Sequence, residues 1–468
     1  MAIKSSTTSA VSIVNPPEDA HGRHVGISLL LLAAPVIAAM ISRTVMSFVD
    51  FVMVSQLGTA AQAAILPAGI LLWCPIGFGY GMAGVVNTFV SQSLGKKRPT
   101  DCTAYAWQGI YLSCGLGLIV LPAWFIFDSL FHWIGHGEDV VYMEVIYAKI
   151  GILAVAPIVG ARAVSSFFTG MHRPLVGLVA AVVSNVFNVI ANYALIFGHW
   201  GFPHMGIAGA AWATLAASLL EFVLLLGWML RPQLARSFHS RRTWRVNREL
   251  MVNLLRVGAP MGMQVLVDIG AWMVFTLFLV GQFGKFQLAA HNICLKILEL
   301  SFMPAVGLSH ALTAAVGKSI GQNRLDLARQ NVRWCLLYTI GYMGLVGLTI
   351  GVFRYSLPGL FTEDHQVTRW AGPIMICCAL YQIFDALTIT FTGALRGAGD
   401  TAWPVFAYVT SAAVVMIGGG LLMTKIAVHW QCIGVWIPAM AHMVLMGVVL
   451  GLRYRFGPWE SLKLGRDS

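Results

Sequence analysis

The sequence predicts an all-α integral membrane protein whose twelve transmembrane helices form two six-helix bundles, and three observations support this class. Of the 468 residues, 58% are hydrophobic and only 10% are charged, whereas soluble domains carry roughly 25% charged residues. The apolar residues fall in long continuous runs of about the 20 residues that a membrane helix needs, not in the short alternating segments of membrane strands. The second half of the chain also repeats the plan of the first half.

The expected spans follow the apolar runs in order along the chain. They are 25–52, 63–90, 104–126, 142–168, 174–197, 207–229, 251–280, 287–316, 331–355, 367–393, 402–424 and 432–453. Basic residues gather in every second connection, which explains the net charge of +11 without a nucleic-acid partner. By the positive-inside rule both termini lie in the cytoplasm, which predicts a multi-pass protein of the inner cell membrane.

The repeat defines how the spans are grouped. The matching segments are Ala34-Pro35 with Ala259-Pro260, Gln56 to Gly58 with Gln282 to Gly284, and Phe168 to Gly170 with Phe391 to Gly393. Their offset stays between 223 and 226 residues. Because each repeat holds an even number of spans, a pseudo-two-fold axis along the membrane normal relates the two bundles, and substrate sites in such proteins form between the halves.

The resulting organisation has five parts, namely a cytoplasmic tail (1–24), an N-terminal lobe (25–230), a linker (231–250), a C-terminal lobe (251–455) and a cytoplasmic tail (456–468). The basic linker is either a surface loop or a tether that contacts lipid head groups. We expect a monomer in the lipid bilayer.

Two acids inside the apolar runs are the most informative residues. A carboxylate in mid-membrane costs several kcal/mol unless it is paired, hydrated or protonated. Asp268 and Asp385 lie about half-way through their spans and have no neighbouring base on their own helices. Buried acids can exchange a proton or hold a small cation, so these two residues are candidates for a coupling site.

The other embedded charges have simpler interpretations. Lys296 and Glu299 are three residues apart, which predicts a structural ion pair. Arg43 and Asp50 are two turns apart on one side of the first span and could interact. Glu221 has no partner nearby in the sequence, and we interpret it as forming a hydrogen bond between helices.

One face of the fifth span is rich in amides. Asn185, Asn188 and Asn192 recur at helical spacing. Two roles remain open for them, because such side chains either join neighbouring helices by hydrogen bonds or line a polar cavity.

Common enzyme motifs are absent from the sequence. It contains no Walker A or HExxH motif, and the GxGxxG match at 79–84 lies within an apolar helix, where glycines serve close packing. His132 and His136 stand four residues apart beside acids, but loop histidines of this kind are usually solvated. We therefore expect no enzyme, no bound metal and no cofactor other than a transported Na⁺ or H⁺.

Four motifs resemble signatures of the multidrug and toxic compound extrusion (MATE) family of transporters, and within it the NorM-like branch. They are Ser47 to Val54, Gln92 to Lys96, Gly206 to Thr214, and Leu380 to Asp385 continuing to Gly393 to Thr401. Together they extend over both halves of the chain.

The resemblance implies a secondary active antiporter for multidrug efflux. Such a protein exports organic, mostly cationic, drugs or metabolites in exchange for H⁺ or Na⁺ by alternating access.

The resemblance also implies which residues form the site. In the NorM-like branch the cation site of the C-terminal lobe falls on Asp268 and Asp385, and the acid of the first span falls on Asp50. The branch commonly has Glu where this chain has Asp268. The branch with its proton site in the N-terminal lobe carries Asp where this chain has Asn192, which weighs against that mechanism. The expected polar lining comprises Asn185, Asn188, Asn192, Gln264, Tyr381, Gln382 and Arg43.

Two rival functions remain open from the sequence. A lipid-linked saccharide flippase of the same fold superfamily would need arginines for pyrophosphate, and only Arg43 and Arg162 are candidates. An intramembrane enzyme would need clustered His and Asp or a paired Asp motif, neither of which is present.

Overall fold

The computed structural model describes residues 22–460 and 462, so most of both predicted tails lies outside the described residues. The described residues form helices and no strands. Eleven helices are long and apolar enough to cross a membrane, and one bent pair raises the number to twelve when it is counted as a single span. The predicted class of multi-span helical membrane protein is confirmed.

The described residues of the first half, from Gly22 onward, form nine α-helices, two of which result from breaks within an expected span. The expected span 63–90 is divided at Val85, and the expected span 142–168 bends by 42° at Ala154. The helices are α1 (Gly22–Ser55), α2 (Thr59–Gly84), α3 (Val86–Gly95), α4 (Pro99–Val120), α5 (Phe127–Ile134), α6 (Glu138–Leu153), α7 (Val155–Gly170), α8 (Pro174–Phe197) and α9 (Ile207–Met229).

The second half follows a short helix in the linker, and two of its spans contain a π-helical turn. The helices are α10 (Pro232–Phe238), α11 (Arg248–Val274), α12 (Lys285–Gly321), α13 (Leu325–Val352), α14 (Ser356–Gly359), α15 (His365–Ala398), α16 (Ala402–Ser411), α17 (Gly419–Ile426) and α18 (Gln431–Phe456). The π turns Phe275–Val280 and Ala412–Gly418 continue α11 and α16.

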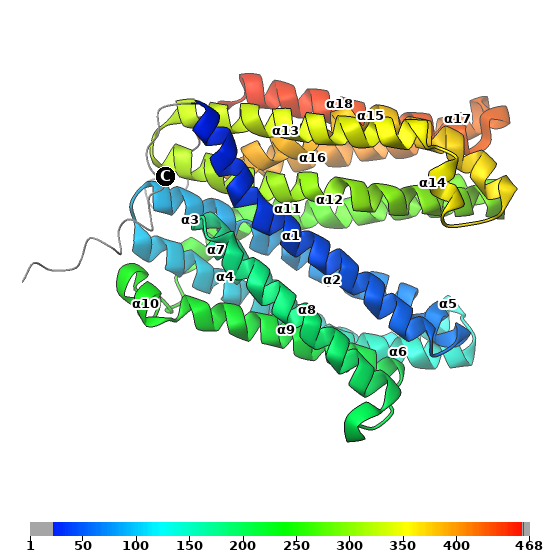
Figure 1. The fold of residues 1–468 in the computed structure, drawn as a ribbon, viewed down its shortest axis with the longest axis horizontal. Helices are drawn as coiled ribbons and strands as arrows, with labels where there is room; N and C mark the ends of the chain where they lie inside the picture. The colour runs from blue at the N-terminus through cyan, green and yellow to red at the C-terminus, as the bar shows by residue number, and fades with distance from the viewer. Residues whose placement is uncertain (1–21, 461, 463–468) are drawn as a thin grey trace, which may run out of the picture.

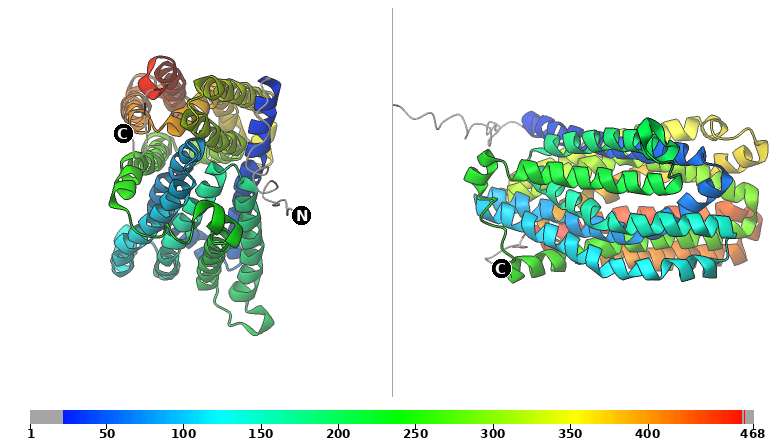
Figure 2. Two further views of the ribbon diagram at one scale, coloured as in Figure 1. Left: turned by 90° about the vertical axis from the view of Figure 1, so that its left-hand side faces the viewer. Right: turned by 90° about the horizontal axis from the view of Figure 1, so that it is seen from below.

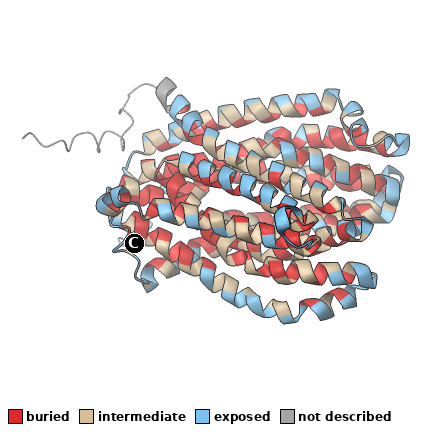
Figure 3. Cartoon of the chain, turned by 60° about the horizontal axis from the view of Figure 1, so that its bottom comes forward, coloured by how far each residue is buried: buried red, intermediate tan, exposed pale blue. Residues whose placement is uncertain are grey.

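The long helices run roughly along one common axis in two neighbouring bundles (Figures 1 and 2). The bundles lie close together at the end that holds α3 and the beginning of α1, and they diverge toward the end that holds α5 and α14 (Figure 1). Buried residues are concentrated toward the end where the bundles are close (Figure 3). The lobes are therefore joined mainly at one end.

The first helix of each lobe also packs into the core of the other lobe. Leu29 and Ala33 of α1 belong to the apolar core that the C-terminal helices build. Leu254 and Met261 of α11 belong to the core of the N-terminal helices. The first part of α1 thus packs in the C-terminal lobe, and the first part of α11 packs in the N-terminal lobe. This reciprocal packing joins the two lobes at this end.

Polar side chains of α3 bind the backbone of the opposite lobe. Asn87 Nδ2 donates to the carbonyl oxygen of His310 at 3.0 Å, and Gln92 Nε2 donates to that of Gly397 at 2.9 Å. Gly95 packs against α12 so closely that a Cβ would lie 2.8 Å from the Gly321 Cα. We call this set of contacts the seal, because it closes the space between the lobes at this end.

The segment predicted as linker packs against the N-terminal lobe. Thr103 Oγ1 of α4 donates to the carbonyl oxygen of Phe238, and Trp107 Nε1 donates to that of Ser240, both at 2.8 Å. Phe238 is itself part of the N-terminal core. This segment is therefore docked on α4, and α11 begins within the predicted linker at Arg248.

Candidate functional site

The acids Asp268 and Asp385 lie on two helices of the C-terminal lobe. Asp268 of α11 accepts a hydrogen bond from the hydroxyl of Tyr408 on α16. Asp385 of α15 lies within range of the charge on Asp268, and Tyr381, one turn earlier on α15, lies within range of the charge on Asp385. We call these four residues the acid cluster. The structure therefore places the two predicted acids in one lobe, within range of each other's charge.

Irregular helix geometry follows two members of the acid cluster. One π turn begins seven residues after Asp268 and the other begins four residues after Tyr408. Within the first turn, Thr276 Oγ1 donates to the Trp272 carbonyl oxygen and lies 2.8 Å from His291 Nε2. Because π turns are rare and often occur at functional sites, their place on two of the three helices of the cluster supports a specialised role there.

A buried histidine extends the acid cluster, and sequence analysis missed it. The His442 ring packs edge-on against Tyr408, with 5.2 Å between ring centroids, and its Nδ1 lies 2.8 Å from Ser411 Oγ. Its Nε2 is buried without a hydrogen-bond partner among the described residues. Its position in the middle of an apolar run was the available signal, but the sequence does not reveal that spans eleven and twelve meet here.

The acid of the first span belongs to a different cluster. Asp50 of α1 accepts a hydrogen bond from Asn192 of α8, and Asn192 also donates to Asn188 Oδ1 at 2.7 Å. Asn185 Nδ2 donates to Ser42 Oγ at 2.7 Å. The amide-rich face therefore joins α8 to α1, and Asp50 lies in the N-terminal lobe, apart from the acid cluster.

The embedded ion pairs differ partly from those expected. Arg43 does not bind Asp50 but forms an ion pair with Glu221 of α9, whose side chain is only 8% exposed. The sequence-based interpretation failed because these partners are far apart in the chain and meet only through helix packing. The expected pair of Lys296 with Glu299 is confirmed, with 2.8 Å between Nζ and Oε2.

The remaining predicted lining residues have varied positions. Gln264 is half-buried on α11, one turn before Asp268. Gln382 is buried, and its Nε2 donates to Ser301 Oγ of α12 at 3.1 Å. Gln382 therefore joins two helices of the C-terminal lobe.

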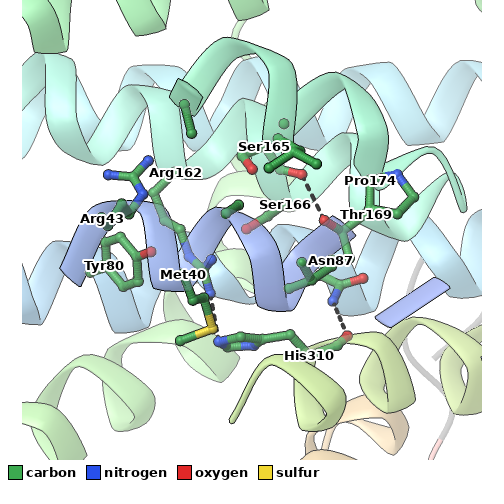
Figure 4. Close-up of a pocket in the computed structure, with 15 residues that line it drawn as sticks. Met40, Arg43, Tyr80, Asn87, Arg162, Ser165, Ser166, Thr169, Pro174 and His310 are labelled. Atoms are coloured by element: carbon green, nitrogen blue, oxygen red, sulfur yellow. Dashed lines mark hydrogen bonds between the residues drawn. The ribbon is translucent and has the colours of Figure 1, made fainter. Parts of the chain in front are cut away.

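A partly polar cavity is lined by the N-terminal lobe, with His310 of α12 contributed by the C-terminal lobe (Figure 4). Its free volume is about 40 Å³, room for about three water molecules. The Arg162 guanidinium lies 4.2 Å above the Tyr80 ring, and its Nη2 lies 3.1 Å from His310 Nε2. The lining residues are Val36, Ala39, Met40, Arg43, Tyr80, Asn87, Arg162, Ser165, Ser166, Thr169, Pro174, Gly177, Leu178, Ala181 and His310.

The two loop histidines do not form a joint site. His136 Nδ1 lies 2.8 Å from Glu144 Oε1, whereas His132 Nε2 lies 3.6 Å from Glu138 Oε2. The backbone oxygen of Asp128 also raises the pKa of His132. Across the described part of the chain, no group of three or more His, Cys, Asp or Glu side chains is placed to hold a metal ion.

The fold and these clusters define a class of protein, namely a multi-span helical membrane protein of two repeated lobes with ionisable groups buried in each. The pattern of the MatE family matches residues 35–194 and 260–421. Because this match covers more than half of the chain, the protein belongs to the MatE family, and it is NorM-like.

Individual relatives agree with this assignment. The chain is 28% identical to the probable multidrug resistance protein NorM of Rhizobium meliloti strain 1021, over 80% of this chain and 82% of that protein. The fold matches the crystal structure of the eukaryotic MATE transporter AtDTX14 with a TM-score of 0.84 and 19% identity, over 94% of this chain and 98% of that one. It also matches the outward-facing conformation of a multidrug resistance MATE transporter of the MOP superfamily, with a TM-score of 0.83 and 19% identity over 94% and 97% of the two chains. The two-lobe, twelve-helix prediction is thereby confirmed.

Proposed function

We propose that this protein is a secondary active antiporter and not an enzyme. It exports organic compounds, mostly cationic drugs or metabolites, in exchange for H⁺ or Na⁺ by alternating access. The observation that carries the proposal is the placement of two buried acids, Asp268 and Asp385, in the C-terminal lobe within range of each other's charge, with the Tyr408 hydroxyl bound to Asp268. Membership in the MatE family and a relative named for multidrug resistance support the same function.

The acid cluster suits ion exchange. Two carboxyls that interact inside a membrane repel each other when both are ionised, so a proton or a sodium ion that binds between them relieves the repulsion. The ion can then favour one arrangement of the lobes over the other only if it binds the two arrangements with different affinities. By thermodynamic reciprocity, binding of the organic compound must weaken binding of the ion.

The placement of the chain in the membrane is part of the proposal. The start of α1 and the described end of the chain lie at the end that holds the seal (Figure 1), and the basic linker follows α9 at that end. The positive-inside rule then places the seal and both termini on the cytoplasmic side of the inner membrane. With the seal closed, the diverging ends of the lobes face outward. We keep the expectation of a monomer.

The decisive experiment is transport in proteoliposomes with a proton gradient and a sodium gradient imposed separately. One gradient should drive uptake of a fluorescent organic cation by the wild type. Equal rates with and without either gradient would contradict antiport.

A lipid-linked saccharide flippase is the second candidate, because Arg43 and Arg162 line one cavity. The ion pair of Arg43 with Glu221 weakens this candidate, since it leaves one arginine for a pyrophosphate. Drug export in a host that lacks its own efflux pumps favours the antiporter, whereas loss of cell-envelope saccharide in a deletion strain favours the flippase.

A further inference from the structure

The lobes carry opposite charges at corresponding positions of the repeat. Asp268 lies eight residues after Pro260, and Arg43 lies eight residues after Pro35. Asp385 lies six residues before Phe391, and Arg162 lies six residues before Phe168. The two arginines line one cavity of the N-terminal lobe, and the two acids lie within range of each other's charge in the C-terminal lobe. The duplication therefore built one acidic pair and one basic pair.

Only one of the two arginines is neutralised. Arg43 is paired with Glu221. No carboxylate pairs with Arg162 among the described residues, and its Nε is buried without an acceptor. Because a guanidinium can only donate, the Nε2 atom of His310 must accept from Arg162, and this histidine is then neutral. The cavity therefore carries a net positive charge located on Arg162.

The surroundings of Arg162 match an anion. The Tyr80 ring and His310 hold the guanidinium in place, so its remaining donors are already oriented. Hydroxyls of Ser165 and Ser166 line the same cavity (Figure 4). A planar guanidinium matches a carboxylate, with which it can form two parallel hydrogen bonds. An unpaired arginine at membrane depth is costly, and a bound anion would offset that cost.

Size limits which part of a ligand can enter. A free volume of about 40 Å³ accommodates an ionic group, whereas whole drug-sized ligands fill pockets of roughly 300 Å³ or more. The body of the ligand would have to lie beyond the cavity, where the lobes diverge.

We propose that this cavity binds the carboxylate of a transported organic compound, with Arg162 as its principal partner. This site adds a substrate contact to the proposed function. It rests on that function only for the statement that the compound is transported. What the proposal adds is the partner of that carboxylate in this chain, the Arg162 guanidinium.

The test is calorimetric binding of three matched probes to the full-length protein in dodecyl maltoside, namely 2-naphthoate, 2-naphthamide and 2-naphthylmethylammonium. The carboxylate should bind most tightly. The substitution Arg162→Gln should weaken 2-naphthoate binding about tenfold to a hundredfold, the effect of losing hydrogen bonds to a charged group. The control Arg324→Gln removes one positive charge from an exposed pair with Asp326 and should leave binding unchanged.

A second variant makes the test independent of Arg162. Glu221→Gln releases Arg43 from its ion pair at the same cavity, so 2-naphthoate should bind more tightly than to the wild type. Size-exclusion elution and thermal unfolding in detergent check that each variant is folded. If Arg162→Gln does not fold, the proposal is still tested by the order of the probe affinities for the wild type and by the affinity of Glu221→Gln for 2-naphthoate.

Three outcomes would overturn the proposal. They are ammonium binding as tight as carboxylate binding, an equal loss of binding in Arg324→Gln, and displacement of 2-naphthoate by inorganic phosphate or phosphatidylglycerol at lower concentration than by benzoate. The last outcome would identify a phosphate or lipid site instead. Since binding in detergent needs no ion gradient, a failure of gradient-driven transport would remove the proposed function and leave this binding result unaffected.

Discussion

The two lobes share one helix plan but carry different chemistry at its polar positions. In the C-terminal lobe, Asp268 accepts a hydrogen bond from the Tyr408 hydroxyl, and Asp385 lies within range of the charge on Asp268. In the N-terminal lobe, Arg43 and Arg162 occupy the matching positions, and one of them is neutralised by Glu221. The repeated fold thus sets the position of a polar group within the membrane but does not set the sign of its charge.

This difference suggests a division of labour between the lobes. A pair of acids attracts a small cation, whereas a single guanidinium without a carboxylate partner attracts an anionic group. Under the proposed function, the C-terminal lobe would couple transport to an ion and the N-terminal lobe would contribute to the choice of substrate. The substitutions below separate these roles, in order of decreasing expected effect.

The largest effect should come from the acid cluster. Asp385→Asn or Asp268→Asn removes a charge that the coupling ion needs, so gradient-driven transport in proteoliposomes should fall to the rate without a gradient. The control Asp326→Asn changes an exposed acid that pairs with Arg324 and should transport like the wild type. Unchanged transport in either Asp268→Asn or Asp385→Asn would remove that residue from the coupling site.

The next effect concerns the buried ion pair of the N-terminal lobe. Arg43→Gln leaves Glu221 charged and 8% exposed, so the free energy of unfolding should fall by roughly 3 kcal/mol, the low end for a broken buried pair. Glu221→Gln should cost less, because the Arg43 side chain is 35% exposed and can reach water.

Thermal unfolding in detergent measures this pair through a double-mutant cycle. The double variant Arg43→Gln/Glu221→Gln should recover much of the stability that Arg43→Gln loses, because no charge then remains unpaired. Additive losses would show that the two side chains do not depend on each other.

The positions of the charged residues explain what sequence could predict. Hydropathy located the spans, and the position of Asp268 and Asp385 inside apolar runs marked them as unusual, because the cost of a charge in a membrane is a local property. Tyr408, His442 and the pairing of Arg43 with Glu221 depend on which helices touch. The sequence contains no signal for such a contact, so the partner of Arg43 was wrongly sought on its own helix.

The shape of the helices was missed for a different reason. Gly84 stands directly before the break at Val85, and Pro157, three residues after Ala154, has no N–H to bond the Leu153 carbonyl oxygen. Because glycine and proline are also common within unbroken membrane helices, these residues were not read as breaks and each run was predicted as one span. The opposite charges of the lobes, by contrast, were available in the repeat itself.

A smaller effect should come from the hydroxyl that binds Asp268. Tyr408→Phe removes one hydrogen bond to a charged group, so gradient-driven transport should fall about tenfold. The matched control is Tyr342→Phe, since Tyr342 donates to the carbonyl oxygen of Ser301 at 3.0 Å and not to an acid. A tenfold loss in this control would mean that any tyrosine hydroxyl of the lobe matters equally.

The smallest effect should come from the exposed ion pair of the C-terminal lobe, which contrasts with the buried pair of the N-terminal lobe. The Lys296 and Glu299 side chains are 71% and 45% exposed. If they face water where the lobes diverge, Lys296→Gln should change the free energy of unfolding by less than about 0.5 kcal/mol, as for other surface pairs. If they face hydrocarbon, the Glu299 carboxylate loses its partner without gaining water, and the loss should approach that of Arg43→Gln. Thermal unfolding of Lys296→Gln, compared with that of Arg43→Gln, therefore shows whether this surface of α12 faces water or hydrocarbon. A large loss of unfolding free energy in Lys296→Gln would contradict an aqueous opening between the lobes.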